Sequence, residues 1–466
     1  MIFSRKYKKD RSSILAFQFL IFFCVLTFFL ASCASSKNSG NSFYADNIVD
    51  FRTEKLSNGI PVYFKQNHGS KVVVLRMVFE GGVVLYDSKI DGIEDFAFDL
   101  AFHGSKNYSY EDLQRLEFEK SFSTISSCSK DYSIAGFTCI ARDLDLVTDV
   151  FADSILNPNM SESDFDQLYN LANQSLVSRK ADPSSVLGLE LSKLAYEDHP
   201  YAVSAQVQEK SISKLTLDAV KRHYETLLNP SRIKFFVVAD MNVDETKEFA
   251  KKLSTVFASL EKKSYSKSSI PKPSVKGITN YAANQQAGET GYIAGLFECP
   301  DKDDSDYIPY ALATLYLDDI FFEQVREKAG AVYFMGTGVV GGKHLLGAIS
   351  AYKANNSKNL KQVIFDAINS LDESTIEKKL EQYKNKYITI LFNSSQNAAG
   401  IAGNMISSLE YFGSETAYLR RSEKVQAVNA GQVYAAYEKY LKKVAQDGGA
   451  SWAVVSNEES LKTFGF

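Results

Sequence analysis

In the first half of the chain, short apolar runs predict strands and a longer period of 3.6 residues predicts helices. The turn signal Ser57-Asn58-Gly59 stands before a strand expected over residues 60–64, and a Val-rich run predicts a second strand over 71–79. A helical pattern covers residues 93–102, and a largely apolar strand is expected over 232–240. This mixture is typical of an α+β domain with helices on one face of a sheet.

The clearest helix signal lies over residues 164–179. Apolar side chains recur there at positions that share one helical face, namely Phe165, Leu168, Tyr169, Ala172 and Leu176. Ser161 and Asp164 resemble a capping pair in front of this helix, and Asp182-Pro183 ends it.

The second half of the chain repeats this order of elements. A strand expected over residues 290–297 is followed by a helix expected over 308–327, which hints at a duplicated unit. The polar, Pro-containing stretch 262–276 has no periodicity and predicts a linker. We therefore expect an N-terminal domain over residues 49–261 and a C-terminal domain over 277–466, each of ordinary domain size.

The N-terminus carries a different pattern. A basic head is followed by an apolar run over residues 14–30 and then by Leu30-Ala31-Ser32-Cys33. This order is typical of a secretory signal, and its last four residues resemble a bacterial lipobox. We expect residues 1–32 to be removed, Cys33 to carry a lipid anchor, and residues 33–48 to form a tether at the bacterial cell envelope. The alternative is an uncleaved membrane anchor, for which a run of this length is near the lower limit.

The composition narrows the function classes. The 466 residues include 45% hydrophobic and 23% charged residues, as in an ordinary globular protein. A net charge of −4, with no basic stretch outside the N-terminus, argues against a nucleic-acid partner. We interpret Cys128, Cys139 and Cys299 as small buried hydrophobes, because an odd number does not suit a disulfide framework. Whether Cys128 pairs with Cys139 cannot be decided from spacing.

Short phrases recur in a fixed order across nearly the whole chain: Leu56-Ser57-Asn58-Gly59, Gly81-Gly82, Gly92-Ile93, Gly104-Ser105, His199-Pro200-Tyr201, Asn229-Pro230 and Arg326-Glu327-Lys328-Ala329-Gly330-Ala331-Val332-Tyr333. Together they resemble the insulinase-like (pitrilysin-type) zinc metallopeptidases, in particular the two-domain, processing-peptidase-like subfamily. The resemblance implies an α+β fold of two similar domains, each an antiparallel-rich sheet packed with helices. These domains are expected to face each other across a chamber that accepts peptides.

Active members of this family carry His-x-x-Glu-His on a helix, where the two His bind zinc and the Glu is the general base. Here Asp95 and Asp99 stand at the His positions and Phe98 at the general-base position. A third ligand, a Glu, is expected near residues 174–176, where the chain has no carboxylate. None of the five His residues has a ligand-like neighbour in the sequence. We expect no catalytic residue and no metal in this chain. The alternative is that Asp95 and Asp99, which share a helical face, help to bind a calcium or magnesium ion.

The resemblance also implies a role for two residues that the chain keeps. In the family, the Arg and Tyr of the phrase matched by Arg326 and Tyr333 line the chamber and hold the substrate. A guanidinium and a phenol suit this task, because both donate hydrogen bonds to a carbonyl or an oxyanion. The alternative is an arginine paired with Glu323 or Glu327 and a half-buried core tyrosine.

These features lead to three hypotheses. In the first, the chain is a non-catalytic, Arg/Tyr-carrying subunit that forms a heterodimer with a zinc-bearing family member, so that any zinc sits in the partner chain. In the second, it is a surface pseudopeptidase that binds a peptide or protein without a catalytic partner. In the third, it is a peptidase with a rebuilt metal site. A family label alone does not decide among them.

Overall fold

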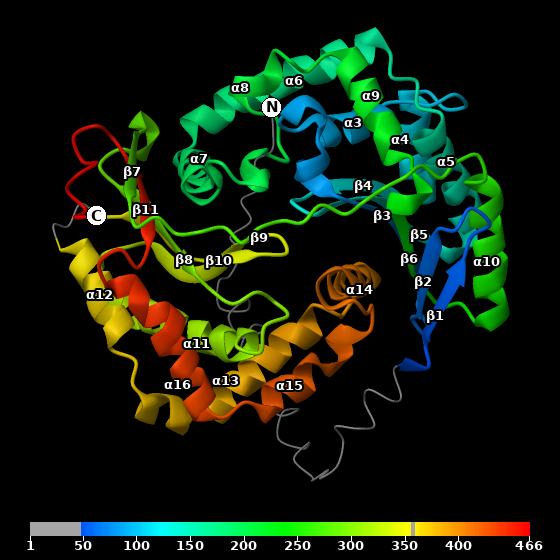
Figure 1. The fold of residues 1–466 in the computed structure, drawn as a ribbon. Helices are drawn as coiled ribbons and strands as arrows, with labels where there is room; N and C mark the ends of the chain where they lie inside the picture. The colour runs from blue at the N-terminus through cyan, green and yellow to red at the C-terminus, as the bar shows by residue number, and fades with distance from the viewer. Residues whose placement is uncertain (1–47, 356–358) are drawn as a thin grey trace, which may run out of the picture. The chain divides into compact units, whose positions relative to one another are not determined.

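The computed structural model describes residues 48–355 and 359–466 (Figure 1). The predicted signal segment and Cys33 lie outside the described residues. The fold is mixed α+β, as expected, and contains two sheets. The first has the strand order β1-β2-β6-β3-β5-β4, with bounds β1 Phe51–Lys55, β2 Pro61–Gln66, β3 Val72–Glu80, β4 Ser123–Cys128, β5 Tyr132–Ile140 and β6 Ile233–Ala239. The second has the order β7-β11-β8-β10-β9, with bounds β7 Thr279–Ala283, β8 Gly291–Glu298, β9 Phe334–Gly341, β10 Leu345–Ala354 and β11 Ser451–Ser456.

The two sheets share one topology. The parallel pair β2–β6 corresponds to the parallel pair β7–β11. The remaining neighbours, β6–β3, β3–β5 and β5–β4, are antiparallel, as are β11–β8, β8–β10 and β10–β9. The first sheet adds only the edge strand β1, which pairs antiparallel with β2. The structure therefore supports the duplicated unit that the order of elements suggested.

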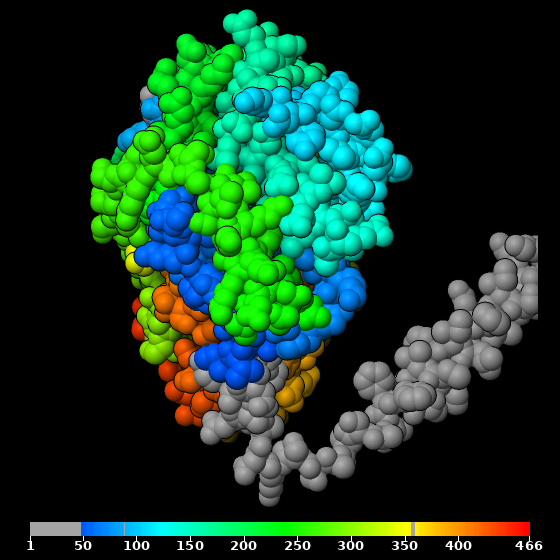
Figure 2. All heavy atoms as spheres, turned by 90° about the vertical axis from the view of Figure 1, so that its right-hand side faces the viewer, coloured from blue at the N-terminus to red at the C-terminus, as the bar shows by residue number. Residues whose placement is uncertain are grey.

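Helices connect and cover these strands. Those between β3 and β7 are α3 Ile93–Ala101, α4 Tyr110–Lys120, α5 Leu144–Leu156, α6 Glu162–Ala181, α7 Pro183–Tyr196, α8 Glu209–Ile212, α9 Leu217–Leu227 and α10 Val243–Val256. Those after β8 are α11 Tyr307–Ile320, α12 Leu360–Asn369, α13 Glu373–Asn393, α14 Ala398–Phe412, α15 Arg421–Ala427 and α16 Ala430–Ala436. Figure 2 shows α10 in green beside the blue residues of β1 at the surface.

The predicted elements match the observed ones closely. The helix expected over residues 164–179 is α6, and Ser161 accepts a hydrogen bond from the Asp164 N–H as its cap. The helix expected over 308–327 begins as α11, but its last two turns, Phe321–Lys328, are a π-helix. This wider helix carries Arg326, and π-helical segments often lie at functional sites.

Strand β3 shows why part of the first sheet reads as an apolar run. Leu75 and Met77 face the main core, whereas Val74 and Val78 face α14. The strand is therefore buried on both faces, which removes the polar half of the usual alternation.

Each half of the chain supplies a helix to the other half's sheet (Figure 1). Helix α7 packs against β11 and β8 of the second sheet. Helix α14 packs Ala402 and Met405 against Val74 and Phe236 of the first sheet. Large apolar side chains buried in this way contribute about 1.5–3 kcal/mol each. This exchange ties the two sheets together, and periodicity did not predict it.

The stretch over residues 262–276 contains neither helix nor strand. It is nevertheless bound to both halves, because His199 Nε2 lies 2.8 Å from the Pro271 carbonyl oxygen and Lys272 Nζ donates to the Cys299 carbonyl at 2.9 Å. Within the described ranges 48–355 and 359–466, none of the helices is long and apolar enough to cross a membrane.

Candidate functional site

Helix α3 carries Asp95, Phe98 and Asp99, the three residues that the sequence resemblance places at the zinc-motif positions. The helix begins after Gly92, which has φ +73° and lies so close to Val207 that an added Cβ would be 2.1 Å from its backbone nitrogen. Only glycine fits this close approach. Phe98 is completely buried, with its ring 5.3 Å from that of Phe79 and 6.4 Å from that of Tyr224. Position 98 therefore belongs to the core and has no access to a reacting water.

Asp95 and Asp99 lie one turn apart on α3 in an unfavourable electrostatic environment. Burial and the charge of Glu94 raise the pKa of Asp95, although a hydrogen bond from the Cys128 thiol opposes this. Asp99 is solvent-exposed at a cavity of about 320 Å³, yet the protein around its carboxyl and the charge of Asp95 raise its pKa to about 6. The two carboxylates repel each other, and neither forms an ion pair within residues 48–355 and 359–466.

This environment leads to a prediction for Asp99→Asn. A carboxyl whose folded pKa is raised favours the folded state most when protonated, so its contribution is present below about pH 4 and is lost as pH rises through about 6. The Asn variant should therefore melt at a higher temperature than the wild type at pH 7.5. Its free energy of unfolding should exceed that of the wild type by less than about 1 kcal/mol, because water screens an exposed carboxylate.

Melting curves between pH 4 and pH 8 measure this effect, and Asp145→Asn on the exposed face of α5 is the control. The gain should vanish near pH 4. A gain of equal size at every pH would mean that ionisation of Asp99 is not its cause.

A buried pair beside this helix was missed in the sequence. Glu94 and His223 are both fully buried, and His223 Nε2 lies 2.9 Å from the Glu94 carboxylate. The His223 Nδ1 faces the Asp87 N–H at 3.3 Å. Because the two residues come from α3 and α9, no local spacing could reveal the pair. The pair fixes α9 against α3. His223 also supplies the partner that a buried carboxylate such as Glu94 requires.

Arg326 and Tyr333 lie together at the end of the π-helix. The guanidinium carbon of Arg326 is 5.7 Å from the centre of the Tyr333 ring and 5.0 Å from that of Phe322. Gly330 has φ +57° and donates its N–H to the Arg326 carbonyl, which ends the helix and turns the chain back toward Tyr333. The sequence phrase thus produces a compact cation–aromatic arrangement.

The exposure of Arg326 and Tyr333 argues against the alternative in which Tyr333 is a half-buried core residue. Tyr333 is 69% exposed, so it is not a half-buried core residue. Arg326 does contact Glu327, but at 3.5 Å and on the surface, while Glu323 pairs with Lys328. Phe322 and Phe334 are also about half exposed. Phe322, Arg326 and Tyr333 lie together, and Phe334 follows Tyr333 in the chain. We call these four exposed or half-exposed residues the Arg326 patch (Phe322, Arg326, Tyr333 and Phe334).

Cys128, Cys139 and Cys299, the cysteines within the described residues, are free thiols. Cys139 and Cys299 are buried and Cys128 is partly buried. Burial raises the pKa of the Cys139 and Cys299 thiols to about 12, so both stay protonated. The interpretation as small buried hydrophobes is confirmed for Cys139 and Cys299, whereas Cys128 is only partly buried, and Cys128 and Cys139 are not paired.

Comparison with known proteins identifies the family. The model described as insulinase (peptidase family M16) matches residues 62–206, and that described as the peptidase M16 inactive domain matches 214–387, so that together they cover more than half of the chain. The chain belongs to the insulinase-like M16 peptidase family. Asp95, Phe98 and Asp99 lie in the segment matched by the insulinase model. Arg326 and Tyr333 lie in the segment matched by the inactive-domain model.

Individual M16 relatives are distant in sequence. An uncharacterized zinc protease of Rickettsia felis is 22% identical over 62% of this chain and 69% of its own length. The mitochondrial-processing peptidase subunit alpha of Bos taurus is 22% identical over 41% of this chain and 36% of its own length. A peptidase M16 inactive domain from Pseudomonas fluorescens superposes with a TM-score of 0.77 at 18% identity, covering 88% of this chain and 99% of the other.

The residues present do not fit the zinc ion of an M16 peptidase. Positions 95 and 99 hold carboxylates with raised pKa, and position 98 is a core phenylalanine. Helix α6 lies beside α3, with the Phe96 and Phe165 rings 5.3 Å apart, but it offers no carboxylate at 174–176. In the part of the chain that the structure describes, no three His, Cys, Asp or Glu side chains are grouped to hold a metal.

Proposed function

We propose that this chain is the non-catalytic, Arg/Tyr-carrying subunit of a two-chain M16 peptidase. The observation that carries the proposal is the contrast between its two family segments. Helix α3 has lost the ligands and the base, whereas Arg326 and Tyr333 are exposed and adjacent. Selection on a substrate-facing surface accounts for an exposed arginine stacked between aromatic rings better than folding stability does, because such pairs stabilise a fold by only ~0.5–1 kcal/mol.

In this proposal a family member with an intact zinc motif supplies the metal, the base and the nucleophilic water. Arg326 and Tyr333 would reach the peptide in a chamber shared by the two chains and donate hydrogen bonds to its carbonyl oxygen as negative charge develops. The bovine relative is itself named as a subunit of a processing peptidase, which supports a partnered arrangement. A lipid on Cys33 would hold the pair at the bacterial envelope, with residues 1–32 removed.

The deciding experiment is to purify the protein from its own membranes in mild detergent and to identify its companions by mass spectrometry. A companion with His-x-x-Glu-His in equal amount supports the two-chain peptidase, and N-terminal analysis of the same sample tests lipidation at Cys33. A chain that comes alone removes the subunit proposal.

For the assembled pair, Arg326→Ala should lower kcat at least about 100-fold, the usual cost of removing one donor to a developing oxyanion, while assembly is retained. Arg115→Ala is the matched control, because Arg115 is an exposed arginine whose ion-pair partner among the described residues is Asp112. Turnover by the Arg326→Ala pair equal to that of the control would remove the proposed role.

A second function is favoured by the Arg326 patch itself. Two half-exposed phenylalanines beside the pair suit a surface that holds an apolar segment without cleaving it. A pseudopeptidase of this kind needs no zinc-bearing partner. If the chain purifies alone, loss of peptide binding in Phe322→Ser and Phe334→Ser would support this function.

A further inference from the structure

A cavity of about 550 Å³ lies in the second half of the chain, among the start of α11, α13, the end of α14 and α15. Three cations line it, Lys302, Arg421 and Lys424, together with the aromatic rings of Tyr307, Tyr387 and Phe412. We call this cavity, defined by these six residues, the Arg421 pocket. It lies apart from α3 and from the Arg326 patch in sequence, and neither shares a residue with it.

The three cations of the Arg421 pocket differ in exposure, since Lys424 is exposed whereas Lys302 and Arg421 are partly buried. Across the described ranges, none of the three forms an ion pair or a hydrogen bond with a carboxylate. They lie instead over aromatic rings: Lys302 Nζ is 3.9 Å from the centre of the Tyr411 ring, and the Arg421 guanidinium is 5.3 Å from that of Phe412. Buried charges in proteins are usually paired, so the partly buried Lys302 and Arg421 are suited to bind an anion.

The electrostatics of Lys302 and Arg421 also favour an anion. Burial lowers the pKa of Lys302, and the nearby charge of Arg421 lowers it further, while Asp131 opposes this effect. Burial also lowers the pKa of Arg421. Two like charges that repel each other in a partly desolvated cavity are stabilised by a bound anion. The first turn of the 14-residue helix α11 forms part of the wall, and its positive end adds to this preference.

The walls and the mouth of the pocket define the ligand class. Tyr307, Tyr387 and Phe412, with Ile308 and Pro309, form an apolar wall that suits a hydrophobic body. Asp303 and Asp304 are exposed at the same cavity, and Asp304 is engaged by the Asp306 N–H at 2.8 Å. These acids disfavour a doubly charged phosphate more than a singly charged carboxylate.

We propose that the Arg421 pocket binds a carboxylate attached to an aromatic or other apolar group. Arg421 and Lys302 hold the carboxylate, and the aromatic wall covers the apolar body. Such a ligand has two sources with the same chemistry, a free organic acid or the C-terminus of a peptide that ends in an apolar residue. The proposal does not depend on whether the chain has a catalytic partner.

The test is calorimetric titration of the detergent-solubilised full chain with 3-phenylpropionate and with its neutral amide. The acid should bind saturably and at least about tenfold more tightly than the amide, because hydrogen bonds to charged groups contribute about 1.5–3 kcal/mol. Equal binding of acid and amide, or tighter binding of phenyl phosphate, would overturn the proposal.

Arg421→Gln and Lys302→Gln should each weaken the binding of 3-phenylpropionate at least about tenfold. Lys361→Gln is the control, because Lys361 also lies over aromatic rings in this half but outside the pocket. Without ligand, both pocket variants should melt at or above the wild-type temperature, since each removes a repelling charge. A lower melting temperature with unchanged binding would show that the cations are structural and would overturn the proposal.

The two sources are separated with the peptides acetyl-Ala-Ala-Phe and its C-terminal amide. Binding of the free-acid peptide alone identifies a chain terminus as the ligand. Binding of 3-phenylpropionate without either peptide identifies an organic acid. Binding of neither probe overturns the site.

Discussion

Phe98→Ala should lower the free energy of unfolding by about 3–5 kcal/mol, the usual cost of deleting a fully buried phenylalanine. The ring is completely buried and contacts the rings of Phe79 on β3 and Tyr224 on α9. A cavity at this position would loosen α3 from the first sheet and from α9 together. Urea unfolding followed by circular dichroism measures the change.

Phe98→Glu, which restores the residue type of the active family members, should cost at least as much. The carboxylate would enter the aromatic cluster formed with Phe79 and Tyr224, and burying a charge in such surroundings is costly. Adding Asp95→His and Asp99→His should not restore peptidase activity, because residues 174–176 supply no third ligand. The packing of position 98 in the core therefore opposes the return of a general base at this position.

Phe118→Ala is the matched control, since this phenylalanine on α4 is 87% exposed. It should change stability by less than about 0.5 kcal/mol. Wild-type stability in the Phe98→Glu variant would mean that position 98 tolerates a charge, and the argument for a core role would fail.

The local elements of the fold were predictable because they rest on nearest-neighbour patterns. The α6 helix follows from its apolar face and its Ser161 cap, and β3 from its Val-rich run. The exchange of α7 and α14 between the sheets was not predictable, because an amphipathic helix does not say which sheet it covers. The π-helical turns around Arg326 were also missed, since their sequence has the same periodicity as an α-helix.

For the candidate site, the sequence predicts the identity of single residues but not their burial or their partners in the fold. The sequence shows Asp95, Phe98 and Asp99 at the positions expected for His, Glu and His. The complete burial of Phe98 was not predictable, because it depends on packing partners from β3 and α9. The Glu94–His223 pair joins residues far apart in the chain. The same holds for the Arg421 pocket, whose cations come from a loop and from α15.

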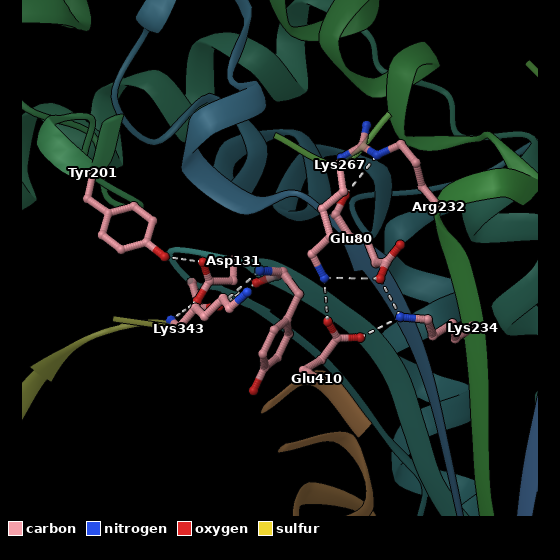
Figure 3. Close-up of polar contacts among 10 residues, drawn as sticks. Glu80, Asp131, Tyr201, Arg232, Lys234, Lys267, Lys343 and Glu410 are labelled. Carbon is pink, nitrogen blue, oxygen red and sulfur yellow. Dashed lines mark hydrogen bonds and ion pairs between the residues drawn. The ribbon is translucent and has the colours of Figure 1, made fainter. Parts of the chain in front are cut away.

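A charge network that joins the two halves is also absent from any local pattern (Figure 3). Lys234 Nζ on β6 lies 2.5 Å from both Glu80 of β3 and Glu410 of α14. Lys267, from the segment between the sheets, contacts the same two carboxylates at 3.5 and 3.4 Å. The Glu410 side chain is only 3% exposed and that of Lys234 is 18% exposed.

Lys234→Met should therefore lower the free energy of unfolding by about 2–3 kcal/mol at pH 7. Removing one partner of a buried pair typically costs about 3–5 kcal/mol, and Lys267 remains to offset part of the loss. Lys180→Met is the control, because Lys180 lies 2.5 Å from Glu209 as an exposed pair and should cost less than about 1 kcal/mol. Equal losses in the two variants would contradict a buried role for Lys234.

The pH dependence of this loss separates a charge effect from a packing effect. Burial opposes ionisation of Glu80, but the hydrogen bond and charge of Lys234, with those of Lys267, outweigh it and lower its pKa. A carboxyl with a lowered folded pKa stabilises the fold above its unfolded pKa, and this contribution is lost as pH falls through the folded pKa. The difference in melting temperature between wild type and Lys234→Met should therefore be largest near pH 7 and should shrink below about pH 4. A difference that stays constant down to pH 3 would assign the loss to packing of the lysine stem rather than to the ionised carboxylates that hold α14 against the first sheet.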